Sequence, residues 1–430
     1  MRRTTRGYRG ALGAAMLGLG LVACDGILEV SDPGRFVDED LDQALQAVAD
    51  GVEGNFYLNL SYHFIQAGLL SDEYRHTGTW APWADIDRGR NIYGNSQSDG
   101  RQDRFLQNRW FAGDAIERFE RVGGDVAPLI ARSRSVEAWA DLILGTTFCE
   151  TPLDAGGAAA PREQVLAQAS SRAAAAQQLA AAAGLNDYVN ANRVAQARAQ
   201  LFLGNLDAAA QLAAQVPTDF AWYAKYSANS PGQNNSIVTL TTVGFNTAAG
   251  LREVYWDDVD LDAGMFVDPF TGELDARLPV SHTGNFGVDG VTPHYSQLKY
   301  NERGANIRLF SGVEARLIEA EAHWARGEHA QALDLINLVR ERAGMSPHAA
   351  TTDGSQVFDY LNHERFIEFF LEGVRLADVN RWGLIPGMLA DGVFVGSEAN
   401  RNVLFPLSQG EGLNNPNIED NISARCLPRV

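Results

Sequence analysis

The most informative segment of this sequence reads NHERFIEFFLEGVRLADVNRWG and spans residues 362–383. Glu364, Glu368 and Glu372 stand four residues apart in it, so on a helix they would lie along one face. Like charges at this spacing repel one another. A helix that carries them therefore needs positive partners close by.

Arg365, Arg375 and Arg381 are near enough in the sequence to neutralise these carboxylates when the chain packs. Phe366 and Phe370 belong to the apolar residues of the same segment, so little of it can face water. We predict a structural network of charges that is partly buried and fully paired. The alternative is a pair of catalytic carboxylates, as in glycoside hydrolysis. Carboxylates beside several arginines would be ionised and occupied, which disfavours that role.

Short motifs stand in order on both sides of this segment. They are Ala320-Glu321-Ala322, ALDLINLVRERAG at 332–344, Leu404-Phe405-Pro406-Leu407 and Asn414-Asn415-Pro416-Asn417. Near the start of the chain they are Leu28-Glu29-Val30 and Pro33-Gly34 after Cys24, and then Ser71-Asp72-Glu73. In order and spacing, essentially the whole chain after residue 23 resembles the SusD/RagB family of outer-membrane nutrient-binding lipoproteins.

The resemblance implies a mainly α-helical, SusD-like scaffold with embedded tetratricopeptide-type helix pairs, a few short strands and long loops. Two features depart from the family pattern. Only one arginine, Arg365, follows Glu364, where the family often has two, and the chain closes on Cys426-Leu427-Pro428-Arg429-Val430 instead of an aromatic stretch. These departures concern the subfamily and not the family.

The first residues have the features of an export signal. Four arginines precede an uncharged stretch at 11–23, which is too short to span a bilayer. The stretch ends in Leu21-Val22-Ala23-Cys24, which resembles a bacterial lipobox. We predict a lipoprotein signal peptide at 1–23, a lipidated tether at 24–37 and a single domain at 38–430. The alternative is ordinary cleavage at a small-residue site, without a lipid on Cys24.

The composition narrows the range of partners. The chain has 430 residues, 45% of them hydrophobic, with 35 basic and 54 acidic side chains and a formal charge of −19. Nucleic-acid binding needs a basic surface, and so does binding to anionic lipids by charge. We therefore expect no nucleic-acid partner and no membrane contact except through the lipid anchor.

Hydrophobic periodicity predicts helices over residues 38–70, 101–121, 133–148 and 162–183, and again from about residue 312. Residues 71–100 and 244–312 lack a clear period, and we expect mostly loops there. The β-branched stretch SIVTLTTV at 236–243 favours a strand.

A weak internal repeat relates residues 197–209 to residues 320–332. Alanines and a central glycine, Gly204 or Gly327, recur with the same spacing in both copies. Small residues let two helices touch and the glycine separates them, which is typical of tetratricopeptide helix pairs. The alternative is a generic helical hairpin.

Two cysteines remain once Cys24 carries lipid. Cys149 and Cys426 form an even pair in a chain predicted to enter an oxidising compartment, which favours a disulfide between them. The alternative is two buried or free thiols.

The best candidate for a ligand site is the polar, aromatic stretch at 74–90. Sugar rings stack on aromatic side chains, while charged and amide groups form hydrogen bonds with the sugar hydroxyls. The candidate ligand-binding residues there are Tyr74, Trp80, Trp83, Asp85 and Arg90. The alternative is that the tryptophans belong to the core beneath a long loop.

Trp256, in Tyr255-Trp256-Asp257-Asp258, is a further candidate, although a half-buried strand end is the stronger interpretation. Asp258, Asp260 and Asp262 resemble the start of a calcium loop, but the glycine comes one place late and position twelve is a proline. No nucleophile, zinc, phosphate-loop or CxxC motif is present. We expect no cofactor, no metal and no enzymatic activity.

The resemblance implies an outer-membrane, lipid-anchored protein that faces the cell exterior. It would capture a nutrient, most simply an oligosaccharide, and deliver it to a SusC-like TonB-dependent barrel. The alternatives are a peptide-binding member of the same class, a protein-binding helical-repeat scaffold and a glycosidase.

Overall fold

The structure is a computed structural model, and it describes residues 38–90, 92–397, 400–418 and 426. The predicted signal peptide, Cys24 and the tether at 24–37 lie outside the described residues. Contacts divide the chain after Ala44 into two units. The short helix α1 (Asp38–Gln43) belongs to the first unit, and all later elements belong to the second.

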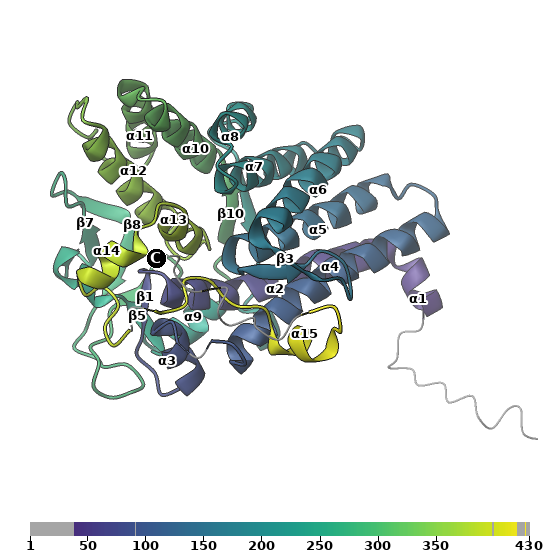
Figure 1. Cartoon of the computed structure of the whole chain (residues 1–430), viewed down its shortest axis with the longest axis horizontal. Helices are drawn as coiled ribbons and strands as arrows, with labels where there is room; N and C mark the ends of the chain where they lie inside the picture. Colours follow the sequence, from purple (N-terminus) through teal and green to yellow (C-terminus); the bar gives the residue numbers. More distant parts are fainter. Residues whose placement is uncertain (1–37, 91, 398–399, 419–425, 427–430) are drawn as a thin grey trace, which may run out of the picture. The chain divides into compact units, whose positions relative to one another are not determined.

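The first half of the second unit is a group of antiparallel helices (Figure 1). Its main members are α2 (Leu45–Leu70), α4 (Ser96–Val122), α5 (Ala127–Thr147), α6 (Arg162–Ala182), α7 (Asn186–Phe202) and α8 (Leu206–Ala213). Successive helices pack on one another, and α2 packs on both α4 and α5. Phe56, Phe105 and Trp139 meet in the core between them. The mainly α-helical fold predicted from the sequence is confirmed.

The second half adds α10 (Gly312–Ala325), α11 (His329–Arg342), α12 (Gly354–Glu368), α13 (Arg375–Arg381), α14 (Ile385–Ala390) and α15 (Gln409–Asn414). Both copies of the internal repeat form helix pairs, α7 with α8 and α10 with α11. Gly204 and Gly327 separate the helices with φ of 79° and 77°, the left-handed region that favours glycine. None of the described helices is both long and apolar enough to cross a bilayer.

The strands are short and antiparallel, and they form four small sheets. The pairs are β1 (Tyr74–His76) with β5 (Ala249–Leu251), β2 (Glu150–Pro152) with β3 (Ala159–Pro161), and β4 (Ala221–Ala224) with β10 (Ile307–Ser311). The four-stranded sheet has the order β6 (Val259–Asp260), β7 (Met265–Val267), β8 (Leu274–Ser281) and β9 (Ser296–Gln297). Residues 244–312, expected to be irregular, therefore contain most of the strands.

The strand predicted at 236–243 is wrong, because Ser236–Thr241 forms the helix α9. The Asn235 side chain accepts a hydrogen bond from the Ile237 amide and so caps the first turn. Ile237 and Val238 are fully buried. Capping and burial outweigh the β propensity of the branched side chains.

The loop expected at 71–100 is also interrupted, by the helix α3 (Ala81–Asp87). Pro82 lies in its first turn, where the missing amide hydrogen costs nothing. Two 3-10 turns, Pro231–Gln233 and Glu253–Asp258, complete the elements of the described chain.

The signature segment differs from its predicted form at Glu372. Helix α12 ends at Glu368, and a tight turn follows in which Leu371 has a φ of 56° and Gly373 a φ of 76°. A Cβ on residue 373 would lie 2.1 Å from the Phe64 ring, so only glycine fits. Glu372 therefore lies beyond the helix and not on its face.

The signature carboxylates are buried and paired as predicted, but with other cations. Glu364 binds Arg277 at 2.6 Å and Arg340 at 2.5 Å. Arg308 lies 2.7 Å from Glu368 and 3.2 Å from Glu372.

The three arginines predicted as their partners bind carboxylates elsewhere. Arg365 binds Asp378 at 2.8 Å, Arg375 binds Asp72 at 2.6 Å, and Arg381 binds Glu321 and Asp378. The sequence-based pairing was wrong because it considered only neighbours along the chain.

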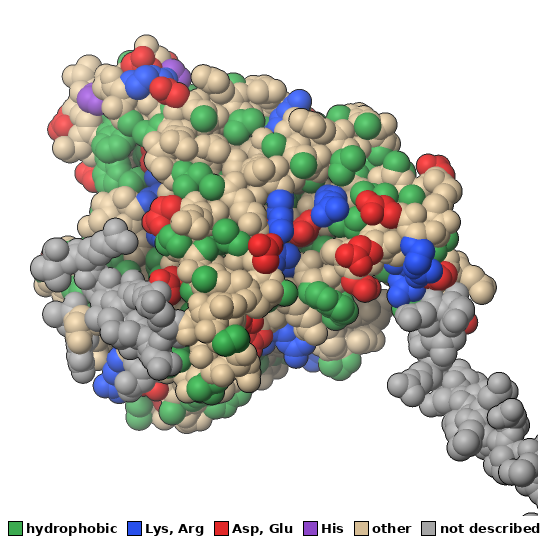
Figure 2. Space-filling view, turned by 45° about the vertical axis from the view of Figure 1, so that its right-hand side comes forward, with side chains coloured by type: hydrophobic (Ala, Val, Ile, Leu, Met, Phe, Trp, Pro, Cys, Tyr) green, Lys and Arg blue, Asp and Glu red, His purple; other side chains and the backbone are tan. Residues whose placement is uncertain are grey.

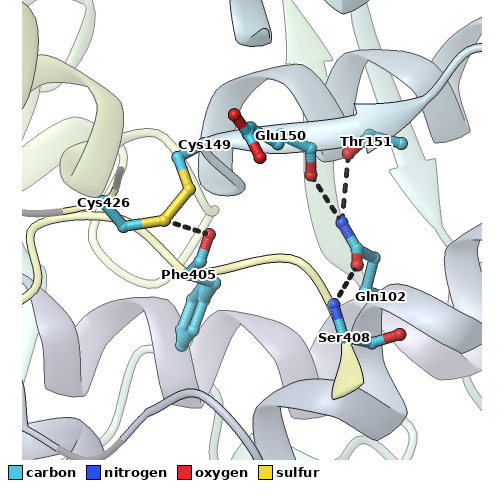
Figure 3. The surroundings of a disulfide bond; sticks show 7 residues. All are labelled: Gln102, Cys149, Glu150, Thr151, Phe405, Ser408 and Cys426. Carbon is cyan, nitrogen blue, oxygen red and sulfur yellow. Dashed lines mark hydrogen bonds between the residues drawn. A yellow bond between two sulfur atoms is a disulfide. The ribbon is translucent and has the colours of Figure 1, made fainter. Parts of the chain in front are cut away.

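A disulfide joins Cys149, after α5, to Cys426. Figure 3 shows how the same region is also held by Gln102 of α4. The Gln102 amide donates to the Glu150 carbonyl at 2.8 Å and accepts a hydrogen bond from the Ser408 amide. The C-terminal segment is thus attached to α4 by a hydrogen bond and to Cys149, just before β2, by the disulfide.

Candidate functional site

A cleft of about 480 Å³ lies beside the predicted ligand segment, and we call it the α3 cleft. It is lined by residues within 75–79, 81–88, 289–292 and 395–396. Strand β1 and helix α3 form one side, and the loop before β9 forms another. Ala81 and Ala84 of α3, and Arg88 directly after it, line the cleft at helical spacing.

Three charged groups of the α3 cleft, Arg75, Asp87 and Asp289, are held by neighbouring residues. The fully buried Arg252 donates to Asp87 at 2.6 Å, and Arg75 pairs with Glu253. Burial opposes ionisation of Asp289, but hydrogen bonds from Thr292 lower its pKa below the ordinary value. The Asp289 carboxylate is therefore ionised at neutral pH and can accept hydrogen bonds from ligand hydroxyls.

His76 also lines the α3 cleft. Its burial lowers the pKa of the imidazole, so it is neutral at pH 7. Its Nε2 atom has no hydrogen-bond partner within the described structure. A ligand hydroxyl is a suitable partner for that nitrogen.

Of the aromatic residues predicted at 74–90, only Trp80 is exposed. Tyr74 is fully buried, with its hydroxyl 2.9 Å from that of Thr241. Trp83 is fully buried too, and its ring meets that of Trp80 edge-on at 5.2 Å. Trp80 is 44% exposed, and the residues on either side of it line the α3 cleft. Tyr74 and Trp83 are thus core residues, and Trp83 supports the Trp80 ring.

The other predicted site residues lie apart from this cleft's lining. Asp85 and Arg90 pair with each other at 3.4 Å. Trp256 is half-buried, stacks on Tyr295 at 4.7 Å and donates to the Leu251 carbonyl. The structure does not bring these three side chains together with Trp80.

A second cleft, of about 710 Å³, was not predicted, and we call it the aromatic cleft. Tyr57 of α2, Tyr188 of α7, and Trp222 and Tyr223 of β4 line it. The rings of Tyr188 and Trp222 lie 4.5 Å apart, and Trp222 donates to the Tyr57 hydroxyl at 3.2 Å. The one signal in the sequence was the adjacent pair Trp222-Tyr223.

The possible metal ligands already have other partners. Asp260, in the calcium-like stretch, accepts hydrogen bonds from the Asp262 and Ala263 amides. Within the described residues, Asp268, His363 and Glu364 come close enough together to hold an ion. Arg340 binds both carboxylates of that group, at 2.6 and 2.5 Å, and so already supplies the positive charge.

The charged side chains are mixed rather than gathered by sign. Figure 2 shows one face on which acidic and basic groups lie interspersed among hydrophobic ones. This face carries no broad basic area of the kind that a nucleic-acid partner requires.

The sequence profile described as the SusD family matches residues 295–423 of this chain. This stretch contains α10 to α15, including the signature segment. No curated protein matches the chain in sequence.

Solved structures resemble the whole fold. A SusD superfamily protein from Bacteroides vulgatus has a TM-score of 0.67 at 17% identity, covering 88% of this chain and 98% of its own. A SusD-like carbohydrate-binding protein from Bacteroides fragilis has a TM-score of 0.68 at 16% identity, covering 86% and 98%. A surface glycan-binding protein A from Bacteroides uniformis has a TM-score of 0.65 at 15% identity, covering 89% and 100%.

The sequence match and the structural likeness point to the same assignment. The profile covers the segment that carries the buried charge network, and the related structures cover the helices on both sides of it. Residues 295–423 therefore match the SusD family in sequence, and the chain as a whole has the fold of SusD-like proteins.

Proposed function

We propose that this protein is a lipid-anchored, nutrient-binding protein of the outer membrane. It captures an oligosaccharide at the α3 cleft and delivers it to a SusC-like TonB-dependent barrel. It is not an enzyme. Two structurally similar proteins are named for binding carbohydrate or glycan, which supports the ligand class.

The observation that carries this proposal is the exposed ring of Trp80 beside a polar cleft. An indole ring offers a flat apolar surface to the C–H face of a sugar. Asp289, Arg88 and His76 supply acceptors and donors for hydroxyl groups at the same place. A rigid aromatic surface with a few fixed polar groups is the usual composition of a small-ligand site.

The test is retention of glycans by the purified protein. Immobilised wild-type protein is incubated with maltohexaose, laminarihexaose, cellohexaose and xylohexaose, and the bound and free fractions are analysed. We expect retention without cleavage. Trp80→Ala should weaken it by about 5–150-fold, because stacking of a flat ligand on an aromatic side chain contributes about 1–3 kcal/mol.

Trp110→Ala is the matched control, since Trp110 is 59% exposed on α4 and lines neither cleft. Release of shortened products would contradict the proposal and indicate a glycosidase. Retention of peptides alone would indicate the peptide-binding variant of the function. If the wild-type protein retains neither glycans nor peptides, the remaining alternative is a protein-binding helical scaffold.

The anchor and the transporter need separate tests. Cys24→Ser should release the protein from the membrane fraction, because the acyl chains are its proposed attachment. A TonB-dependent barrel should co-purify with the wild-type protein from solubilised outer membranes. A membrane-bound Cys24→Ser protein would argue against the lipid anchor.

A further inference from the structure

We propose that the aromatic cleft is a second saccharide site, which takes an uncharged oligosaccharide and works independently of the α3 cleft. The two clefts have no lining residue in common. The aromatic cleft is the larger of the two, and its volume is within the range of about 300–1,000 Å³ that is typical of ligand sites.

The floor of the aromatic cleft is held rigidly by Arg132 of α5. Its Nε atom lies 2.9 Å from Glu53 and 3.0 Å from the Tyr188 hydroxyl. The Tyr188 hydroxyl in turn donates to Glu53. The Tyr188 ring is thereby fixed before any ligand arrives, so little side-chain entropy is lost on binding.

Tyr223 provides the surface on which a sugar ring can stack. It is 45% exposed, whereas its neighbour Trp222 is packed against Trp139 and Tyr188. Tyr223 also lines a second, smaller cleft of about 240 Å³. A ligand seated on this ring can reach from one cleft into the other, which favours an oligomer over a single sugar.

The charges at the aromatic cleft favour an uncharged ligand. Two cations, Arg132 and Lys225, and two carboxylates, Glu53 and Asp187, line it. Arg132 and Glu53 neutralise each other in the floor. Lys225, Asp187 and the Asn186 amide are exposed at the mouth, where they can bind sugar hydroxyls as donors and acceptors.

Lys225 also makes the cleft easy to observe. The chain has only two lysines, Lys225 and Lys299. Lys299 is largely buried and pairs with Glu372 at 2.9 Å. Lys225 is exposed, and no carboxylate of the described residues pairs with it. Reductive methylation keeps the charge of lysine, so a ¹³C-methyl label on Lys225 reports on the cleft without changing its electrostatics.

The experiment follows the NMR signal of ¹³C-methylated Lys225 during titration with the four neutral hexasaccharides and with a galacturonic acid hexamer. The signal is assigned with Lys225→Arg. We expect at least one neutral oligosaccharide to shift the signal to saturation, and the uronate to shift it more weakly. Tyr223→Ala should weaken this binding about tenfold or more, since it removes the stacking surface.

Trp80→Ala separates this proposal from the function proposed for the α3 cleft. Trp80→Ala should abolish or weaken retention at the α3 cleft and leave the titration of the Lys225 signal unchanged. Trp110→Ala should change neither measurement. Thermal unfolding of each variant establishes that it is folded.

The proposal is overturned if no neutral oligosaccharide moves the Lys225 signal or if only the uronate does. It is overturned equally if folded Tyr223→Ala binds like wild type. A Trp80→Ala protein that loses the Lys225 response would show that the two sites are not independent.

Discussion

Glu364 shows how this protein keeps ionised groups inside its core. The side chain is fully buried, and it is bound by Arg277 and Arg340. Burial opposes its ionisation, but the His348 imidazole 3.5 Å away and the charge of Arg277 hold its pKa well below the ordinary value. The group is therefore an anion at any physiological pH, which suits a structural role and not proton transfer.

Replacing Glu364 by glutamine should destabilise the protein strongly. The amide keeps the shape but leaves two buried guanidinium groups without their shared anion, which costs about 3–5 kcal/mol. Urea unfolding followed by circular dichroism measures the loss. The control is Asp207→Asn, because Asp207 is 77% exposed in its pair with Arg326 and should contribute less than about 1 kcal/mol. Similar losses in both variants would contradict the buried-network interpretation.

Glu73 behaves in the opposite way and makes the stability depend on pH. Its burial raises the pKa of the carboxyl to about 8, although a hydrogen bond from the Leu371 amide acts against this. The folded protein therefore holds a proton on Glu73 that the unfolded chain releases near pH 4.5. Its contribution to stability is complete below that pH and is lost as the pH rises to about 8.

Glu73→Gln should remove this dependence, because glutamine resembles the protonated acid and still accepts from Leu371. The free energy of unfolding of the variant relative to wild type should rise between pH 5 and 8, with a slope approaching about 1.4 kcal/mol per pH unit. Denaturant unfolding at a series of pH values gives this difference. Parallel curves for the two proteins would show that Glu73 is ionised in the fold.

At the scale of elements, the helix pairs depend on their glycine turns. Gly327 has a φ of 77°, and no other atom lies within 4 Å of a Cβ built on it. Gly327→Ala should therefore lose about 1–2 kcal/mol through backbone strain alone. Gly113→Ala, inside α4 with equal space around it, should instead stabilise the protein by about 0.5–1 kcal/mol. Thermal unfolding of both variants tests the contrast, and a shift of the same sign in each would refute it.

Elements with a clear helical period were predictable from the sequence, and short elements were not. The helix expected at 162–183 is α6, and the break at Gly204 falls where the repeat placed it. Helices α3 and α9 were missed because each has only two turns or fewer, too short to show a period. Their positions depend on Pro82 in one case and on the Asn235 cap in the other.

At the scale of the whole molecule, the disulfide holds the C-terminal segment against the helical half. Cys149 and Cys426 are separated by 277 residues, so the bridge restricts the unfolded chain strongly. Cys149→Ala/Cys426→Ala should lower the free energy of unfolding by about 2–5 kcal/mol. Dithiothreitol should lower the melting temperature of the wild type and leave that of the double variant unchanged. An effect of reductant on both would mean that it acts elsewhere.

The sequence located the region of the α3 cleft but not its lining. Residues 74–90 do border it, yet Asp289 and Gly396 come from segments about two hundred and three hundred residues further along the chain. The aromatic cleft could not be predicted from the sequence for the same reason. Its residues Tyr57, Tyr188 and Trp222 come together only when three separate elements pack. Signature residues can identify a family, whereas the partners in a site depend on the packing of distant elements.

The bridge between Cys149 and Cys426 also determines how the molecule would respond to mechanical force. Tension applied at the two ends of the chain passes across the sulfur atoms and bypasses the 277-residue stretch that they enclose. About 900–1,000 Å of contour length therefore cannot be extended until the disulfide is reduced. An oxidised molecule pulled from its ends would yield a short extension, and a reduced one a far longer extension.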